Sequence, residues 1–422
     1  MVILLLLVAS AVLGSRDAFG QIVWTKDAHN PVLSGGASGA WNQHVFNPCV
    51  LYNSDSARYE MWFGACPDIS AGPYYIGFAS SKDRVTWSMH PTPVLSPDPG
   101  TWDEGWVADQ RVLRENGQYK IWYTSWPSGV SKIGYATSAD GITWLKDTVH
   151  NPVMGPGTSA WDAGGPDHPF VMPVPAGYKM WYTGWSDLGV GRIGYATSAD
   201  GITWLKDTVH NPVLSTGAAG QWDDLLIGQP VVVRIYSKYY MWYSALHSGD
   251  TTMSGLAVSL DGINGWTKEP TNPLLMPSPG SWDAGRTSIY SVLLREAGDT
   301  LDLWSDGIAS GRSYSIGHAT SAVVVGVTDR LQEFPQHLML AQNYPNPFNP
   351  TTEIAYQISG VSDVKLAVYD ILGREVAVLV NENKAPGMYT VQFNGSGLAS
   401  GVYLYRLTAG SFVETRKMAF VK

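Results

Sequence analysis

The chain of 422 residues is poor in features that would point to several common classes of protein. Its only cysteines are Cys49 and Cys66, and their spacing matches no zinc or iron–sulfur pattern. Charged residues make up 15% of the chain, and its formal net charge of −9 argues against nucleic acid as a partner and against binding through a basic patch to a membrane surface. No amphipathic helical run stands out, which argues against a helical fold.

Long apolar runs are also lacking beyond the first twenty residues. Val2 to Leu13 is apolar but too short to span a bilayer, and Ala18-Phe19-Gly20 supplies small residues before a cleavage point at Gln21. We therefore expect residues 1–20 to be a signal peptide and the chain to have no membrane span. Because export favours oxidation, the two cysteines form either a disulfide or a pair of buried thiols.

Aromatic residues, glycine and proline are plentiful, and they occur in a repeat. The segment Ile133 to Val153 reads IGYATSADGITWLKDTVHNPV, and it recurs letter for letter 60 residues later, from Ile193 to Val213. Looser copies begin at Ile76 and Leu256. A fixed period of this size indicates an array of similar structural units.

Five such units follow one another between Trp24 and Ser321. Each contains an opening Trp, a short apolar strand, an aromatic strand, an IGYAT-like strand and an S-x-D-G-x-T-W turn before a fourth strand. The fifth unit lacks its last piece, and the N-terminal WTKDAHNPVL from Trp24 supplies it. We therefore predict an all-β fold, with a five-bladed β-propeller over 21–321 closed by an N-terminal strand.

The end of the chain has a different pattern. We expect a linker over 322–341 and a small Ig-like β-sandwich over 342–422, because alternating strands recur there. The motifs NYPNPFNPTT from Asn343, VYDILGREV from Val368 and LASGVYLYRL from Leu398 resemble the type A sorting domain of the type IX secretion system. This resemblance implies the secretion machinery as a partner and a secreted or cell-surface location outside the outer membrane of a Gram-negative bacterium.

The repeat separates structural residues from functional ones. A residue type that recurs from blade to blade is assigned to the fold. This applies to the Asp after four of the opening Trp residues and to the Asp of the turns, namely Asp103, Asp162, Asp223, Asp283, Asp140, Asp200 and Asp261. Three Trp residues fall outside the repeat: Trp106, Trp126 and Trp185. Each either packs in its loop or stacks on sugar rings at the mouth of the central funnel that the five blades of a propeller surround. Because all three are expected around this one mouth, we favour stacking on sugar.

Residues that differ between blades at the start of the inner strand are the candidates for function. They are the pairs Phe46-Asn47, Ala108-Asp109, Asp167-His168, Gly228-Gln229 and Ile289-Tyr290, with His44, Glu104 and Arg286 nearby. The propeller resembles the furanosidase-type glycoside hydrolases, the clan of arabinanases, xylosidases and invertases, and the related mannoside phosphorylases. That resemblance implies catalytic carboxylates at inner-strand starts.

Carried over to this chain, the resemblance implies Asp109 and Asp167 as catalytic carboxylates, with Glu104 or His168 as the proton-carrying partner. Asn47 stands where the related enzymes have an Asp, and an amide cannot act as a base. We expect the substrate-binding residues to be Asn47, His44, Trp106, Trp126, Trp185, Gln229, Arg286 and Tyr290. No cofactor or metal is assigned.

Two functions remain open at this point. The first is a secreted glycoside hydrolase acting on a poly- or oligosaccharide, and the second is a carbohydrate-binding propeller whose active site has degenerated. A third hypothesis is a protein-binding surface scaffold. It would predict apolar residues in the funnel, whereas the residues expected there are polar.

Overall fold

The computed structural model describes residues 22–322 and 339–422, apart from short gaps at 127–128, 236–237, 247–250, 296–299, 310, 312, 344, 359–361, 385–386 and 411. The signal peptide expected over 1–20 lies outside the described residues. The chain forms two compact units, one containing 22–322 and the other containing 339–422. The described secondary structure is all β, with no helix among these residues.

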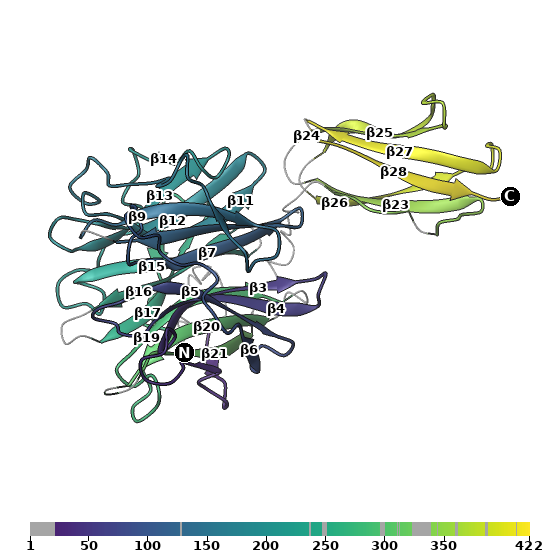
Figure 1. Cartoon of the computed structure of the whole chain (residues 1–422). Helices are drawn as coiled ribbons and strands as arrows, with labels where there is room; N and C mark the ends of the chain where they lie inside the picture. The colour runs from purple at the N-terminus through teal and green to yellow at the C-terminus, as the bar shows by residue number, and fades with distance from the viewer. Residues whose placement is uncertain are drawn as a thin grey trace, which may run out of the picture. The chain divides into compact units, whose positions relative to one another are not determined.

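The first unit is a propeller of five blades (Figure 1). The first blade contains β3 (His44–Asn53), β4 (Arg58–Cys66), β5 (Tyr75–Ser81) and β6 (Trp87–Met89). The second contains β7 (Ala108–Glu115), β8 (Gln118–Ser125), β9 (Lys132–Ser138) and β10 (Leu145–Lys146). The third contains β11 (Gly165–Val174), β12 (Gly177–Trp185), β13 (Gly191–Ser198) and β14 (Leu205–Lys206). The fourth contains β15 (Leu226–Ile235), β16 (Lys238–Leu246), β17 (Thr252–Ser259) and β18 (Thr267–Lys268).

The fifth blade is completed by the N-terminal segment. It contains β19 (Arg286–Leu294), β20 (Thr300–Ile308) and β21 (Ser315–Ala322), and β21 pairs with both β1 (Thr25–Lys26) and β2 (Leu33–Ser34). In Figure 1 the purple N-terminal strand accordingly lies beside the green β21. This pairing leaves no open edge between the first and last blades, so the predicted five-bladed propeller and its closing strand are confirmed.

In four blades an ion pair with a buried carboxylate joins the opening loop to the outermost strand. The Asp after the opening Trp accepts a hydrogen bond from a lysine on that strand, at 2.5–2.8 Å, in the pairs Asp103–Lys146, Asp162–Lys206, Asp223–Lys268 and Asp283–Lys26. The carboxylates are at most 3% exposed. The first blade has exchanged both members, because the side-chain amide of Asn42 lies 2.9 Å from the sulfur of Met89. The paired exchange supports a structural role for these Asp residues.

Consecutive blades are joined by the tryptophan of each second strand. The indole N–H of Trp62 donates to the carbonyl of Gly141 in the next blade, at 2.7 Å. Trp122 and Trp181 make the same contact with Gly201 and Gly262. A Cβ on Gly141 would lie 2.8 Å from the Trp62 ring, which explains the glycine in the turn.

The second unit is a sandwich of two sheets. One sheet has the order β22 (Met339–Leu340), β23 (Thr351–Ile358), β26 (Gly387–Asn394). The other has the order β25 (Glu375–Lys384), β24 (Ser362–Tyr369), β27 (Gly401–Ala409), β28 (Phe412–Phe420). Their inner faces share one apolar core that includes Phe348, Tyr405 and Phe420. The predicted sandwich is confirmed, and its first strand β22 begins inside the stretch expected to be linker.

Both cysteines are buried and carry free thiols. No described helix is long and apolar enough to cross a membrane.

Candidate functional site

A bulge in each inner strand turns one side chain toward the propeller axis. The register shifts between Phe46 and Cys49 in the first blade, and equivalent shifts occur in the other four. The residues at these bulges are Asn47, Asp109, His168, Gln229 and Tyr290, and all five line one cavity. The first four have φ values of 46–56°, a strained conformation for residues other than glycine. The five positions that the alignment of the blades predicted to face the funnel therefore meet near the propeller axis.

The strained bulges are held by side chains from the preceding blade. Thr124 accepts a hydrogen bond from the backbone amide of His168 at 3.1 Å, and Thr183 accepts one from Gln229 at 2.9 Å. In the fifth blade the same task falls to a carboxylate, because Asp306 Oδ2 accepts from the amide of Asn47 at 3.3 Å. Asp306 thus replaces a threonine and puts an acid into the cavity.

Sequence reasoning missed Asp306, although the signal was present. The last residue of the aromatic strand motif is Gly, Thr, Thr, Ser and Asp in the five blades, at Gly64, Thr124, Thr183, Ser244 and Asp306. Only the fifth is ionisable. Asp306 belongs to the second strand of its blade, β20, where it pairs with Ser288 of β19, so a pattern limited to the inner strands does not include it.

A histidine connects the two carboxylates predicted at the inner-strand starts. His168 Nδ1 lies 2.8 Å from Asp167 Oδ1, and His168 Nε2 lies 3.1 Å from Asp109 Oδ1. The side-chain amide of Asn47 also donates to Asp109 Oδ1, and the indole of Trp185 donates to Asp167 Oδ2 at 2.6 Å. Both oxygens of Asp167 are therefore engaged, whereas among the described residues no hydrogen bond reaches Asp109 Oδ2.

The pKa values of two buried groups in the cavity are both raised, but for different reasons. Burial would lower the pKa of His168, but the carboxylates of Asp109 and Asp167 outweigh it and raise that pKa well above its ordinary value. Burial raises the pKa of Asp306 to about 7, although the Asn47 amide, Arg286 and His168 oppose the shift. The cavity thus combines an imidazolium between two carboxylates with an acid that is half-protonated near neutral pH.

The same three residues have the composition of a cation site. Ligand atoms of Asp109, Asp167 and His168 lie within 4.8 Å of one another. However, both ring nitrogens of His168 already pair with the carboxylates. A bound cation would have to displace one of these contacts, so we assign no metal role to the cluster.

The three tryptophans outside the repeat all line the 250 Å³ mouth of the funnel. Trp106 stacks on Tyr74, with ring centroids 3.6 Å apart, and meets Trp126 edge-on at 6.1 Å. Trp126 is 44% exposed and therefore offers its ring to a ligand. Trp185 contributes through its contact with Asp167, so the structure assigns different parts to the three rings.

The remaining predicted residues divide into those that reach the cavity and those that do not. Gln229, Arg286 and Tyr290 line it, and Arg286 donates to the Tyr314 hydroxyl at 2.8 Å. His44 lies behind this wall, where its Nδ1 accepts from the Tyr314 amide at 3.3 Å. Glu104 is exposed in its loop and is absent from the residues lining the funnel.

Comparison with known families identifies the second unit. Residues 342–421 match the family model of the secretion system C-terminal sorting domain. The chain therefore carries such a sorting domain, and the resemblance noted from its motifs is confirmed.

Comparison with known proteins also finds similarity in the propeller. A 1,2-beta-oligomannan phosphorylase from Thermoanaerobacter sp. (strain X514) is 26% identical over 209 residues, which are 47% of this chain and 63% of that protein. The chain thus spans less than two thirds of the curated relative that it matches.

Solved structures share the fold at lower sequence identity. A beta-1,2-mannobiose phosphorylase from Listeria innocua is 14% identical with a TM-score of 0.57, covering 74% of this chain and 99% of that one. A structure described with the mannoside phosphorylase family, which contains hydrolases of beta-1,2 mannosidic linkages in Candida mannan, is 19% identical with a TM-score of 0.57. It covers 73% of this chain and 95% of that one. These likenesses establish the propeller fold.

Proposed function

We propose that this chain is a secreted glycoside hydrolase in which Asp306 is the general acid and Asp109 the general base. The observation that carries the proposal is the pair of carboxyl groups on either side of Asn47. The backbone amide of Asn47 donates to Asp306, and its side-chain amide donates to Asp109. Glycoside hydrolases use two carboxyl groups that face one cavity in unequal environments, so this pair supports the proposal.

Asp306 suits the role of the acid. Its pKa of about 7 leaves the carboxyl partly protonated at neutral pH, so it can deliver a proton to the leaving oxygen as the bond to the anomeric carbon breaks. The exposed Glu104, our expectation for this role from the sequence, lies outside the funnel lining. Asp306 therefore replaces Glu104 in the proposal.

Asp109 suits the role of the base. His168 and Asn47 occupy its Oδ1, which leaves Oδ2 to take a proton from a water that attacks the anomeric carbon. Asp167 bonds to His168 and Trp185 through its two oxygens, so we place it as a positioning residue.

The substrate class follows from the walls of the cavity and from the relatives. Exposed aromatic faces beside polar groups suit the apolar and hydroxylated faces of a sugar ring. The similar proteins named above act on beta-1,2 mannosidic linkages, so such mannosides come first among candidate substrates. The C-terminal sorting domain supports export by the type IX secretion system and an extracellular polysaccharide as the natural target.

A non-catalytic carbohydrate-binding propeller is the second candidate. It is favoured by Asn47, which occupies the position where the related enzymes have a catalytic Asp. In that case the funnel would hold a sugar without cleaving it, and Asp306 would serve only to hold the Asn47 bulge.

The test incubates the full chain with beta-1,2-mannooligosaccharides and with arabinosyl and xylosyl glycosides, with and without inorganic phosphate. Release of reducing sugar and thermal shift are measured together. We expect release that is lost in Asp306→Asn and Asp109→Asn and retained in the matched control Glu104→Gln. A thermal shift without release would establish the binding module. Phosphate-dependent formation of a sugar phosphate would instead show phosphorolysis.

A further inference from the structure

A second cavity lies at the junction of the first and fifth blades, at the opposite ends of their strands from the bulges. Its volume is about 380 Å³, and its lining includes Tyr52, Tyr59, Lys82, Arg84, Arg295 and Asp302. The hairpin joining β3 to β4 and the start of β20 border it. No described residue lines both this cavity and the funnel.

The first blade breaks the rule of its own repeat at this cavity. The turn residue that is glycine at Gly141, Gly201 and Gly262, with φ between 76° and 82°, is Arg84 in the first blade. Arg84 adopts φ 77°, a left-handed conformation that costs free energy for any residue with a Cβ. The position two residues before Arg84 is also changed, since Lys82 stands where the other turns have Ala139, Ala199 and Leu260.

The contacts between blades also vary around the ring. In three junctions the tryptophan of the second strand donates a hydrogen bond to the turn glycine of the next blade. The equivalent Trp242 and Trp304 of the fourth and fifth blades have buried indole N–H groups without a partner among the described residues. The strained backbone at Arg84 therefore distinguishes the junction of the fifth and first blades, and such strain is typical of a site retained for its side chains.

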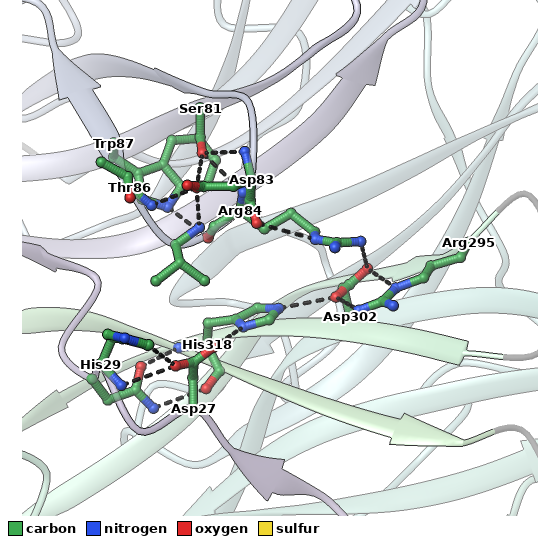
Figure 2. A network of polar contacts seen from close by, with 12 residues as sticks. Asp27, His29, Ser81, Asp83, Arg84, Thr86, Trp87, Arg295, Asp302 and His318 are labelled. Atoms are coloured by element: carbon green, nitrogen blue, oxygen red, sulfur yellow. Dashed lines mark hydrogen bonds and ion pairs between the residues drawn. The ribbon is translucent and has the colours of Figure 1, made fainter.

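The side chains concerned form a basic, aromatic surface. Arg84 reaches across the junction toward Asp302, at 3.5 Å (Figure 2). Its guanidinium also lies over the ring of Tyr59, 5.5 Å from the ring centroid. Tyr59 packs against Tyr52 with ring centroids 5.0 Å apart. Lys82 is exposed and pairs with no described residue.

Asp302 is the one acid among the described residues that line the cavity, and cationic side chains surround it. Both Nε and Nη2 of Arg295 bond to the Asp302 carboxylate at 2.8 Å, and His318 Nε2 approaches it at 3.0 Å. Figure 2 shows Arg84 and Arg295 converging on Asp302 from two sides. Two guanidinium groups thus face one carboxylate, and Lys82 adds a further positive charge, so the described lining keeps a net positive charge that can attract an anion.

We propose that this junction cavity binds an anionic saccharide, whose carboxylate or sulfate group pairs with Lys82 and Arg84 while its ring lies against Tyr52 and Tyr59. Charge-assisted hydrogen bonds to an oxyanion and contact with an aromatic face are the two interactions that such a sugar offers. The site is separate from the funnel and would anchor the propeller on an acidic polysaccharide.

The test measures binding of the full chain to oligogalacturonate, which carries carboxylates, and to sulfated dextran, with neutral dextran as the control polymer. We expect binding to one or both anionic ligands, weakening as salt is raised, and none to neutral dextran. Lys82→Ala should weaken binding about tenfold, because it removes one charge-assisted hydrogen bond. Lys82 is exposed, so this variant should fold.

A matched variant separates the site from net charge. Lys82→Ala combined with Ala139→Lys moves the lysine to the same turn position of the second blade, and it should bind as weakly as Lys82→Ala alone. Trp126→Ala, in the funnel, should bind normally. Equal binding by wild type and Lys82→Ala, restored binding in the charge-moved variant, or loss of binding in Trp126→Ala would each overturn the proposal.

Discussion

The inner-strand bulges and the outer ends of the blades are built from the same repeat but have diverged to different degrees. At the outer ends, four blades keep the identical Asp–Lys pair, and the first blade exchanged both members together. At the bulges, all five blades differ, with Asn47, Asp109, His168, Gln229 and Tyr290. Repetition thus marks the residues that hold the fold, whereas the residues that differ at equivalent positions are those that line the funnel.

The largest expected effect comes from making the fifth blade conform to the second and third. Asp306→Thr should keep a hydroxyl acceptor for the Asn47 amide, as Thr124 and Thr183 provide for their neighbours, but should remove the acid. Glycoside cleavage should fall about 10²–10⁴-fold, the usual contribution of a general acid. Steady-state kinetics on the glycoside that the wild-type protein cleaves would measure this loss of activity. Unchanged kcat with a lower unfolding midpoint would show that Asp306 is purely structural.

A change at the outer ends should act on stability alone. Asp162→Ala leaves the partly buried Lys206 without its partner and should cost up to about 3 kcal/mol of the free energy of unfolding, the lower end of the range for a fully buried pair. The double variant Asp162→Asn with Lys206→Met copies the Asn42–Met89 pair of the first blade and should recover most of that loss. Urea unfolding measures both. If the double variant is no more stable than Asp162→Ala, the paired exchange in the first blade has another cause.

The pH dependence of stability should distinguish the two regions further. The pKa of Asp306 is about 7 in the folded state and ordinarily 3.8, so the folded state keeps this proton up to a higher pH than the unfolded state does. The penalty for the buried carboxylate is absent below pH 3.8 and grows as pH rises to about 7. Asp306→Thr should therefore gain stability over wild type by at most about 1.4 kcal/mol per pH unit across this window. A constant difference in the free energy of unfolding from pH 4 to pH 7 would contradict the buried acid.

The smallest effect is expected at the mouth. Trp126→Ala should raise KM or Kd about 3–10-fold with little change in stability, because the ring is 44% exposed and contributes mainly contact area. Trp122→Ala, at a repeat position that is fully buried, should instead destabilise the propeller by about 3–5 kcal/mol. Thermal unfolding and ligand titration of both variants would separate the two classes of tryptophan.

Most of the fold could be predicted from sequence because blade packing repeats. The 60-residue period and the displaced WTKDAHNPVL segment together determine five blades and their closure. The candidate site was only partly predictable. Asp109, Asp167 and His168 were identified from inner-strand positions, whereas Asp306 comes from a neighbouring strand and Glu104 faces solvent. Proximity across blades depends on how sheets pack around the axis, which no local pattern records.

The sequence by itself determined the propeller, the closing strand and the sorting domain, because each rests on local strand and turn chemistry repeated or matched over many residues. Only the tertiary structure decided which side chains meet. It placed Asn47 between Asp306 and Asp109, set His168 between two carboxylates, and brought Arg84 of the first blade to Asp302 of the last. These contacts join residues up to 259 positions apart, and burial and mutual charge there alter the pKa values on which chemistry depends.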